Sequence, residues 1–257
     1  MTGRAGVATL VVVVACLAAG CTVGPAGGGD PGWVEADGET VNATALTGSH
    51  VEALSEAGSY VVEREALVFL PPDGPDPDRL RPNQSVRREV DLEARQRTAV
   101  REGPEDRTTR VYVDDDRYYA RVVTSRETTY RTREANWGRI PPTDPSTVTP
   151  LFGDWNLTYE GTAERDSERL HRVTGEPPAD YEGADLEAVD AASVELLVTD
   201  GGVIRRIEHR ATGTVGASRS GETETVEVTY VTRRRYGAVG ETTVEEPDWV
   251  EEARASG

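Results

Sequence analysis

Few side chains in this sequence could carry out chemistry, and their spacing groups none of them into a known site. The histidines, His50, His171 and His209, have no second histidine or cysteine close by, whereas zinc sites usually pair such ligands at short spacing. The serine-nucleophile motif G-x-S-x-G is absent, and the S-x-x-K and P-loop motifs are impossible because the chain has no lysine. The sequence therefore predicts no catalytic residues, no metal site and no cofactor, and we expect a protein that is not an enzyme.

Two other groups of residues could bind a ligand or could have a purely structural role. The acidic run Asp114-Asp115-Asp116 could bind Ca²⁺, but an EF-hand loop needs a glycine at its sixth position, which is missing here. A solvated hairpin turn is therefore favoured. The tryptophans could form sugar platforms in a secreted hydrolase, but we interpret them as core anchors or as a rim; they are Trp33, Trp137, Trp155 and Trp249.

The N-terminus indicates export. Residues 5–19 form an uncharged stretch after Arg4, which is shorter than the ~20 residues of a membrane span but suits a signal peptide. The stretch ends in Ala18-Ala19-Gly20-Cys21, which resembles the lipobox of secreted lipoproteins. The resemblance implies that residues 1–20 are removed and that Cys21 carries the lipid that anchors the chain to the extracytoplasmic face of the membrane. An ordinary signal peptide and a retained membrane helix are the alternatives.

The remainder of the chain divides into a tether, one domain and a tail. Residues 21–41 are rich in glycine and bury too little apolar surface to offset backbone entropy, so we expect a lipidated flexible tether. Residues 42–250 are expected to form a single domain, and residues 251–257 a disordered tail. Because the chain is expected to be exported, the N-x-S/T patterns at Asn42, Asn83 and Asn156 are weak candidates for glycosylation.

The chain is strongly acidic. It has 46 acidic against 28 basic residues, a net charge of −18, and every basic residue is an arginine. Such self-repulsion strains a compact domain in dilute buffer, whereas near 1 M salt the screening length falls to about 3 Å. The composition resembles that of proteins from extreme halophiles, particularly haloarchaea. Because the sequence offers no basic face to meet phosphates, we expect no nucleic-acid partner.

Period-two alternation of apolar and charged residues dominates the predicted domain, as in antiparallel strands that are covered on one side only. From Val86 to Val100 one phase is largely apolar and the other almost wholly charged. We expect this segment to be one long strand, which forces the sheet to twist or curl strongly. About nine or ten strands are predicted, over residues 60–70, 86–100, 109–113, 118–124, 127–133, 155–159, 170–174, 193–199, 203–211 and 222–235.

Helices are expected to be few. The pattern Ser49-x-x-Glu52 predicts a capping box that starts a short helix, which ends at Gly58. Residues 144–152 and 183–189 are weaker helical candidates. The fold class is therefore mainly β (α+β), with one strongly curved antiparallel sheet, a half-barrel, and a few short covering helices.

This order of elements, with the lipobox and the tether, resembles the LolA/LppX type of lipoprotein domain. It is also similar to haloarchaeal lipoproteins of unknown function, whose C-terminal ending resembles Pro247-Asp248-Trp249-Val250. The resemblance implies that lipid or acylated cargo binds on the concave face of the half-barrel, and it supplies no catalytic residues.

The expected ligand face consists of small aliphatic side chains that alternate along the strands. Such a face could leave a cavity for an apolar ligand or be filled as a modest core, and the filled core is slightly favoured. An envelope protein is the other expected partner; a structural role without a ligand is the alternative, and a secreted hydrolase is less favoured. The residues predicted to line this face are Val62, Val68, Val86, Val90, Leu92, Val100, Val111 and Val113.

Overall fold

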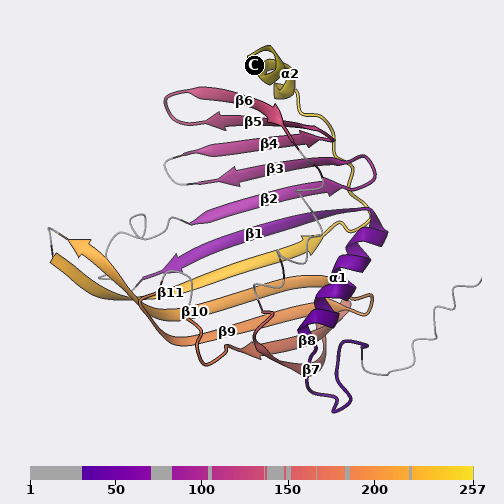
Figure 1. The fold of residues 1–257 in the computed structure, drawn as a ribbon, viewed down its shortest axis with the longest axis vertical. Helices are drawn as coiled ribbons and strands as arrows, with labels where there is room; N and C mark the ends of the chain where they lie inside the picture. The colour runs from indigo at the N-terminus through magenta and orange to yellow at the C-terminus, as the bar shows by residue number, and fades with distance from the viewer. Residues whose placement is uncertain are drawn as a thin grey trace, which may run out of the picture. The chain divides into compact units, whose positions relative to one another are not determined.

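The computed structural model describes residues 31–70, 83–103, 106–135, 137, 148, 152–165, 167–182, 186–219 and 222–256. These residues belong to one compact unit, residues 31–257. It is mostly β, with two helices, which confirms the predicted fold class at this level (Figure 1). The elements are α1 (Ala43–Ala57), β1 (Ser59–Phe69), β2 (Gln84–Asp91), β3 (Gln96–Glu102), β4 (Thr108–Asp114), β5 (Arg117–Val123), β6 (Thr128–Glu134), β7 (Asn156–Arg165), β8 (Glu168–Glu176), β9 (Ala188–Thr199), β10 (Ile204–Arg219), β11 (Glu222–Gly237) and α2 (Trp249–Ala255).

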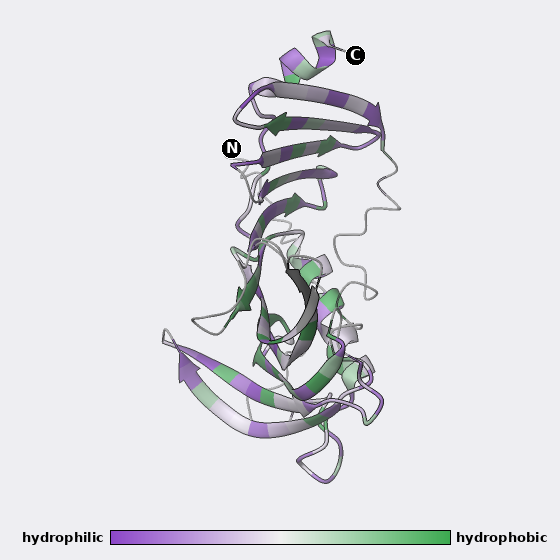
Figure 2. Cartoon of the chain, turned by 90° about the vertical axis from the view of Figure 1, so that its left-hand side faces the viewer, coloured by the Kyte–Doolittle hydropathy of each residue, from purple (hydrophilic) through white to green (hydrophobic). Residues whose placement is uncertain are grey.

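The strands form one antiparallel sheet of 11 strands in the order β6-β5-β4-β3-β2-β1-β11-β10-β9-β8-β7. The order joins two meanders, β1–β6 and β7–β11, through the pairing of β1 with β11. Strands β6 and β7 are the two edges, so the sheet is open in the part of the chain that the structure describes. Apolar and polar residues alternate as green and purple bands along the strands (Figure 2).

The predicted single strand over residues 86–100 is wrong, because this segment is a hairpin. Strand β2 ends at Asp91, a turn follows, and β3 begins at Gln96. The carboxylate of Asp91 accepts a hydrogen bond from the backbone N–H of Ala94 at 2.8 Å, and Arg95 takes a positive φ of 55°. Both features are typical of a tight turn. The turn preserves the alternation of residue types, so periodicity alone could not reveal it.

Helix α1 starts earlier than predicted. Its N-cap is Asn42, whose side-chain oxygen accepts a hydrogen bond from the N–H of Ala45 at 2.9 Å. The predicted capping box at Ser49 is therefore wrong, since Ser49 lies inside the helix, whereas the predicted end at Gly58 is confirmed by its left-handed φ of 74°.

Helix α1 packs on one face of the sheet, which we call the α1 face. Leu46 and Leu54 of the helix share a hydrophobic cluster with Tyr60, Val90 and Tyr236 of strands β1, β2 and β11. The cluster continues over β7–β10 with these buried residues: Leu157, Val173, Val194, Leu196, Val198, Ile204 and Ile207.

The second half of the predicted tether is folded, so its boundary at residue 41 is wrong. Trp33 is only 4% exposed and lies in the same cluster as Leu46. A β-bridge joins Val34 to Val41, and the N–H of Val41 donates to the carbonyl of Leu157 at 3.1 Å. These apolar anchors hold the described part of the glycine-rich segment against the sheet.

The predicted disordered tail is also wrong through residue 255, because α2 covers the face opposite α1. Trp249, Val250 and Ala253 are buried in a cluster with Tyr112 and Tyr119. Paired bonds at 2.6 and 2.7 Å join the guanidinium of Arg254 to the carboxylate of Glu246. No helix among the described residues is long and apolar enough to cross a membrane.

The structure describes only part of the two segments that were weaker helical candidates. Most of residues 144–152 lies outside the described residues. Of residues 183–189, the described part is not helical, since Ala188 and Val189 begin β9.

Candidate functional site

Cross-strand pairing shows which predicted ligand-face residues share a side of the sheet, because directly opposed residues project to the same face. The chain of pairs from Val62 through Arg88, Ala99 and Val111 reaches Ala120 on β5. It starts in the cluster beneath α1, so all of these residues lie on the α1 face. The predicted residues that the pairing places there are Val62, Val68, Val86, Val90, Val111 and Val113.

Two of the predicted residues lie elsewhere. Val100 pairs with Arg87 and Arg110 on the opposite face, and it lines a cavity of about 630 Å³ beside the segment that leads into α2. Leu92 lies in the turn between β2 and β3 and packs against the core beneath α1. Both were assigned to the ligand face because the β2–β3 turn was missed, and the turn reverses the phase of β3.

Beneath α1 the face is filled. Val62 and Val90 are 9% and 1% exposed and belong to the main hydrophobic cluster. A filled core, the favoured interpretation of the sequence, is what the structure has at these two positions.

Beyond α1 the same face carries a narrow apolar strip on the neighbouring strands β4 and β5. Val111 is paired with Ala120, and Val113 precedes the turn to β5. Val113 and Ala120 are buried, while Val111 and Val122 are half-buried. We call these four residues, Val111, Val113, Ala120 and Val122, the apolar lane.

Arginines border the lane on both sides. Arg97 and Arg101 project from β3 on one side, and Arg131 and Arg133 project from β6 on the other. At a strand spacing of about 4.8 Å, β3 and β6 lie roughly 14 Å apart. We call these four residues the border arginines.

The α1 face of strands β1–β6 contains no acidic residue at its paired positions. Further arginines on it are Arg64, Arg88 and, on β11, Arg234. The acids of the same strands all project from the opposite face; they are Glu63, Glu65, Glu89, Asp91, Glu102, Asp114 and Glu134. The expectation that no basic face exists is therefore wrong, because the pleat separates charges that are mixed in the sequence.

The border arginines have no carboxylate partner among the described residues. Desolvation and the positive charge of Arg88 lower the pKa of Arg97, whose Nε is buried without a hydrogen-bond partner. Desolvation and the charge of Arg234 likewise lower the pKa of Arg88. Neighbouring positive charges on this face thus lower one another's pKa, as like charges do.

Two further contacts shape the border of the lane. The guanidinium carbon of Arg133 lies 4.2 Å from the ring centroid of Tyr118, a cation–π contact beside Val113. Near Val122, a cavity of about 270 Å³ is lined by Gln84, Arg101, Gly103, Arg107 and Thr109. The lane thus has an arginine-lined cavity at one of its ends.

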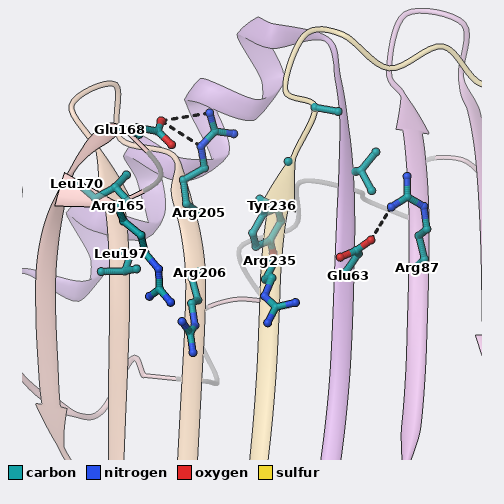
Figure 3. A pocket seen from close by; sticks show the side chains of 13 residues that line it. Glu63, Arg87, Arg165, Glu168, Leu170, Leu197, Arg205, Arg206, Arg235 and Tyr236 are labelled. Atoms are coloured by element: carbon teal, nitrogen blue, oxygen red, sulfur yellow. Dashed lines mark hydrogen bonds and ion pairs between the residues drawn. The ribbon is translucent and has the colours of Figure 1, made fainter. Parts of the chain in front are cut away.

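A different cavity, of about 520 Å³, lies on the opposite face (Figure 3). Its apolar lining includes Leu170 and Leu197, which are buried. Its charged residues are largely paired: Glu63 with Arg87, Glu168 with Arg205 at 3.3 Å, and, just beyond the lining, Glu208 with Arg206. The lining also includes Arg165 and Arg235, so arginines outnumber acids here, but unlike the border arginines most of them have a carboxylate partner.

The histidines serve the core. The His171 ring makes contacts with the Tyr159 hydroxyl at 2.9 Å and with the Asp200 carboxylate at 2.8 Å, and His209 contacts the Tyr181 hydroxyl at 2.9 Å. The predicted half-buried strand position of His209 is confirmed, and burial lowers its pKa. None of the three cavities described above is lined by a histidine.

The other sequence candidates lie apart from the lane. Asp115 and Asp116 form the exposed β4–β5 turn, and Asp115 pairs with Arg95 at 3.1 Å. The described residues contain no group of histidines, cysteines and acids that could hold a metal ion. Trp33 and Trp155 anchor the main core and Trp249 the cluster at α2, as predicted, whereas Trp137 is half-buried.

The three asparagines of the N-x-S/T patterns all lie at the ends of helices or strands. Asn42 caps α1 and donates to Glu35 at 3.1 Å, Asn83 accepts from the N–H of Val68 at 3.0 Å, and Asn156 is exposed at the start of edge strand β7. The signal peptide and Cys21 lie outside the described residues.

Comparison with known proteins identifies a family. A search of curated proteins finds no match. Among solved structures, the lipoprotein LppX of Mycobacterium tuberculosis is 15% identical, with a TM-score of 0.42 over 79% of this chain and 99% of that chain. A LolA superfamily protein from Nitrosomonas europaea is 11% identical (TM-score 0.26; 82% and 97% covered), and an outer membrane lipoprotein-sorting protein domain from Vibrio parahaemolyticus is 7% identical (TM-score 0.28; 80% and 98% covered). The model of the family of unknown function DUF7537 matches residues 5–253, and the chain therefore belongs to this family.

Proposed function

We propose that this protein is anchored by a lipid at Cys21 on the extracytoplasmic side of the membrane and binds the apolar chain of a lipid or of acylated cargo. The apolar chain of the ligand would lie along the apolar lane, on the inner side of a sheet curved as a half-barrel. The observation that carries the proposal is the lane itself, which continues the apolar α1 face past the filled core to strands β4 and β5.

The composition of the lane suits an acyl or isoprenoid chain. Its side chains are Val and Ala, which offer aliphatic contact without polar atoms. At about 3.3 Å per residue, the strand from Thr109 to Val113 is roughly 13 Å long. Arginine stems are long enough to lie across such a strip and to move aside when a ligand replaces them.

We also propose that the protein acts without catalysis. The rings of His171 and His209 make core contacts with tyrosines, and His50 of α1 is buried. A hydrolase needs a polar cleft where a base meets a nucleophile, and the cavities described above bring no histidine to such a place.

Native mass spectrometry of the mature protein, purified from its own host, tests the binding. We expect an additional mass of an extractable lipid, which is lost in Val111→Asp. Val100→Asp is the matched control, because Val100 is also half-buried and is next to Val111 in the sheet, but projects from the opposite face. Val90 is unsuitable because it is 1% exposed, and a charge there would unfold the core.

Absence of any ligand from the unmodified protein would contradict the proposal. It would favour the alternative role, in which the protein contacts an envelope partner and carries no small molecule. Loss of the ligand from both variants would also contradict the lane as the binding site.

A further inference from the structure

We propose that the ligand of the apolar lane is an anionic lipid, whose acidic headgroup is held by the arginines that surround the lane. This inference rests on the proposed function and specifies the chemistry of its ligand. It follows from the separation of charge across the sheet, which the sequence conceals.

The first argument is charge complementarity. In a chain with a net charge of −18, the α1 face of β1–β6 carries arginines and, at its paired positions, no acid. The acids on these strands project from the opposite face, where Glu63 and Glu89 both pair with Arg87. A ligand with a negative charge supplies a counter-charge that no described residue gives the border arginines as an ion pair.

The second argument is the placement of the arginines relative to the apolar surface. Arg101 and Arg107 line the cavity of about 270 Å³ near Val122, and Arg101 donates to the side-chain oxygen of Gln84 at 2.7 Å. Guanidinium groups bind phosphate oxygens in pairs of hydrogen bonds. A headgroup in this cavity would let the attached chain extend along the lane toward Val113.

The geometry favours a lipid over a nucleic acid. Single-stranded nucleic acids bind to grooves in which aromatic side chains stack on successive bases. The lane consists of Val and Ala, and the ring of Tyr118 beside Val113 is in contact with Arg133. The acidic opposite face would also repel a long polyanion. An isolated headgroup with an aliphatic chain matches both the charge and the apolar surface.

A panel of ligands with identical acyl chains tests the inference on the full mature chain. Dissociation constants are measured by displacement of a fluorescent fatty-chain probe, at one salt concentration, for dioleoyl phosphatidylglycerol, dioleoyl phosphatidylcholine and dioleoylglycerol. Inorganic phosphate and a single-stranded oligonucleotide are further arms. We expect phosphatidylglycerol to bind at least tenfold more tightly than the other two lipids, because charge-assisted hydrogen bonds are the strongest of the polar contacts.

Two variants of equal charge locate the headgroup. The variant Arg101→Gln/Arg131→Gln/Arg133→Gln removes exposed arginines beside the lane, and Arg110→Gln/Arg117→Gln/Arg210→Gln removes exposed arginines of the opposite face. We expect the first to abolish the preference for phosphatidylglycerol over dioleoylglycerol, and the second to retain it. Circular dichroism verifies that each variant is folded.

The outcomes separate this inference from the proposed function. Equal binding of all three lipids would overturn the anionic headgroup and leave lipid binding intact. Binding of none of them would overturn the proposed function itself. The inference would also be overturned if inorganic phosphate displaced the probe at the same concentration as phosphatidylglycerol. Tighter binding of the oligonucleotide than of phosphatidylglycerol would overturn it too.

Discussion

The imidazole of His50 in α1 accepts a hydrogen bond at Nδ1 from the backbone N–H of Ile204, which begins β10, at 3.1 Å. Because Nδ1 is the acceptor, the proton of the neutral ring is on Nε2, which is buried without a hydrogen-bond partner. The ring also meets Tyr236 edge to face, with centroids 4.5 Å apart. This contact fastens α1 to the sheet and requires that His50 stay neutral.

The stability of the fold should therefore depend on pH through His50. Burial, and secondarily the charge of Arg234, lower the pKa of His50 from 6.5 to about 4. Between these values the unfolded chain binds a proton that the folded chain does not, so stability is complete above pH 6.5 and falls as the pH drops toward 4. Urea unfolding at pH 7.5 and 5.5 should show a loss of about 1 kcal/mol from this group.

His50→Asn provides the control, because its side-chain oxygen accepts a hydrogen bond but does not titrate. We expect the variant to show a smaller loss between the two pH values than the unmodified protein. All other ionisable groups are the same in both proteins, so the difference isolates His50. An identical pH dependence in both would contradict the assignment.

Gly202 should not tolerate a side chain. It takes a φ of 82° in the β9–β10 turn, and a Cβ there would lie 2.9 Å from Cβ of Ser49 in α1. Gly202→Ala should destabilise the protein by about 2 kcal/mol or more, since it adds a left-handed backbone strain to a steric clash. Gly201→Ala is the matched control, because its nearest neighbour is 3.7 Å away. Similar midpoints of urea unfolding for the two variants would refute this contact.

The sequence predicted turns correctly where they contain glycine, and missed a turn that does not. The Asp200-Gly201-Gly202 hairpin was predicted because glycine supplies the positive φ of the turn, and Gly202 has it. The β2–β3 hairpin was missed because its turn, which includes Arg95, contains neither glycine nor proline. One missed turn lowered the predicted number of strands and placed Val100 on the wrong face.

The candidate site was predictable only in part for the same reason. Valines of one phase indicated an apolar face, and pairing places six of the eight predicted residues on it. The border arginines were not predicted, because Arg97 and Arg101 share the phase of Glu89 in the sequence and project to the face of Val90 only after the chain reverses. A face is a property of strand pairing, which composition does not encode.

Helix α2, in the C-terminal segment, should contribute to the free energy of unfolding through its buried side chains. Trp249 is 7% exposed and packs with Tyr112 and Tyr119. Trp249→Ala should lower the free energy of unfolding by about 3 kcal/mol, because it removes a large buried ring. Glu251→Ala, an exposed position of the same helix, should change it by less than about 0.5 kcal/mol. Equal, small effects in circular dichroism melts would mean that the segment does not pack in solution.

Replacement of Cys21 should change where the protein is found. Under the proposed function the membrane anchor is a lipid on this cysteine, which follows the small residues Ala18-Ala19-Gly20 of the lipobox-like segment. Cys21→Ser should move the protein from the membrane fraction to the medium, as measured by immunoblotting of the two fractions. Cys16→Ser is the control, since Cys16 lies within the predicted signal peptide and should leave the protein membrane-bound. If Cys21→Ser stayed with the membrane, the anchor would have to be a retained apolar N-terminal segment.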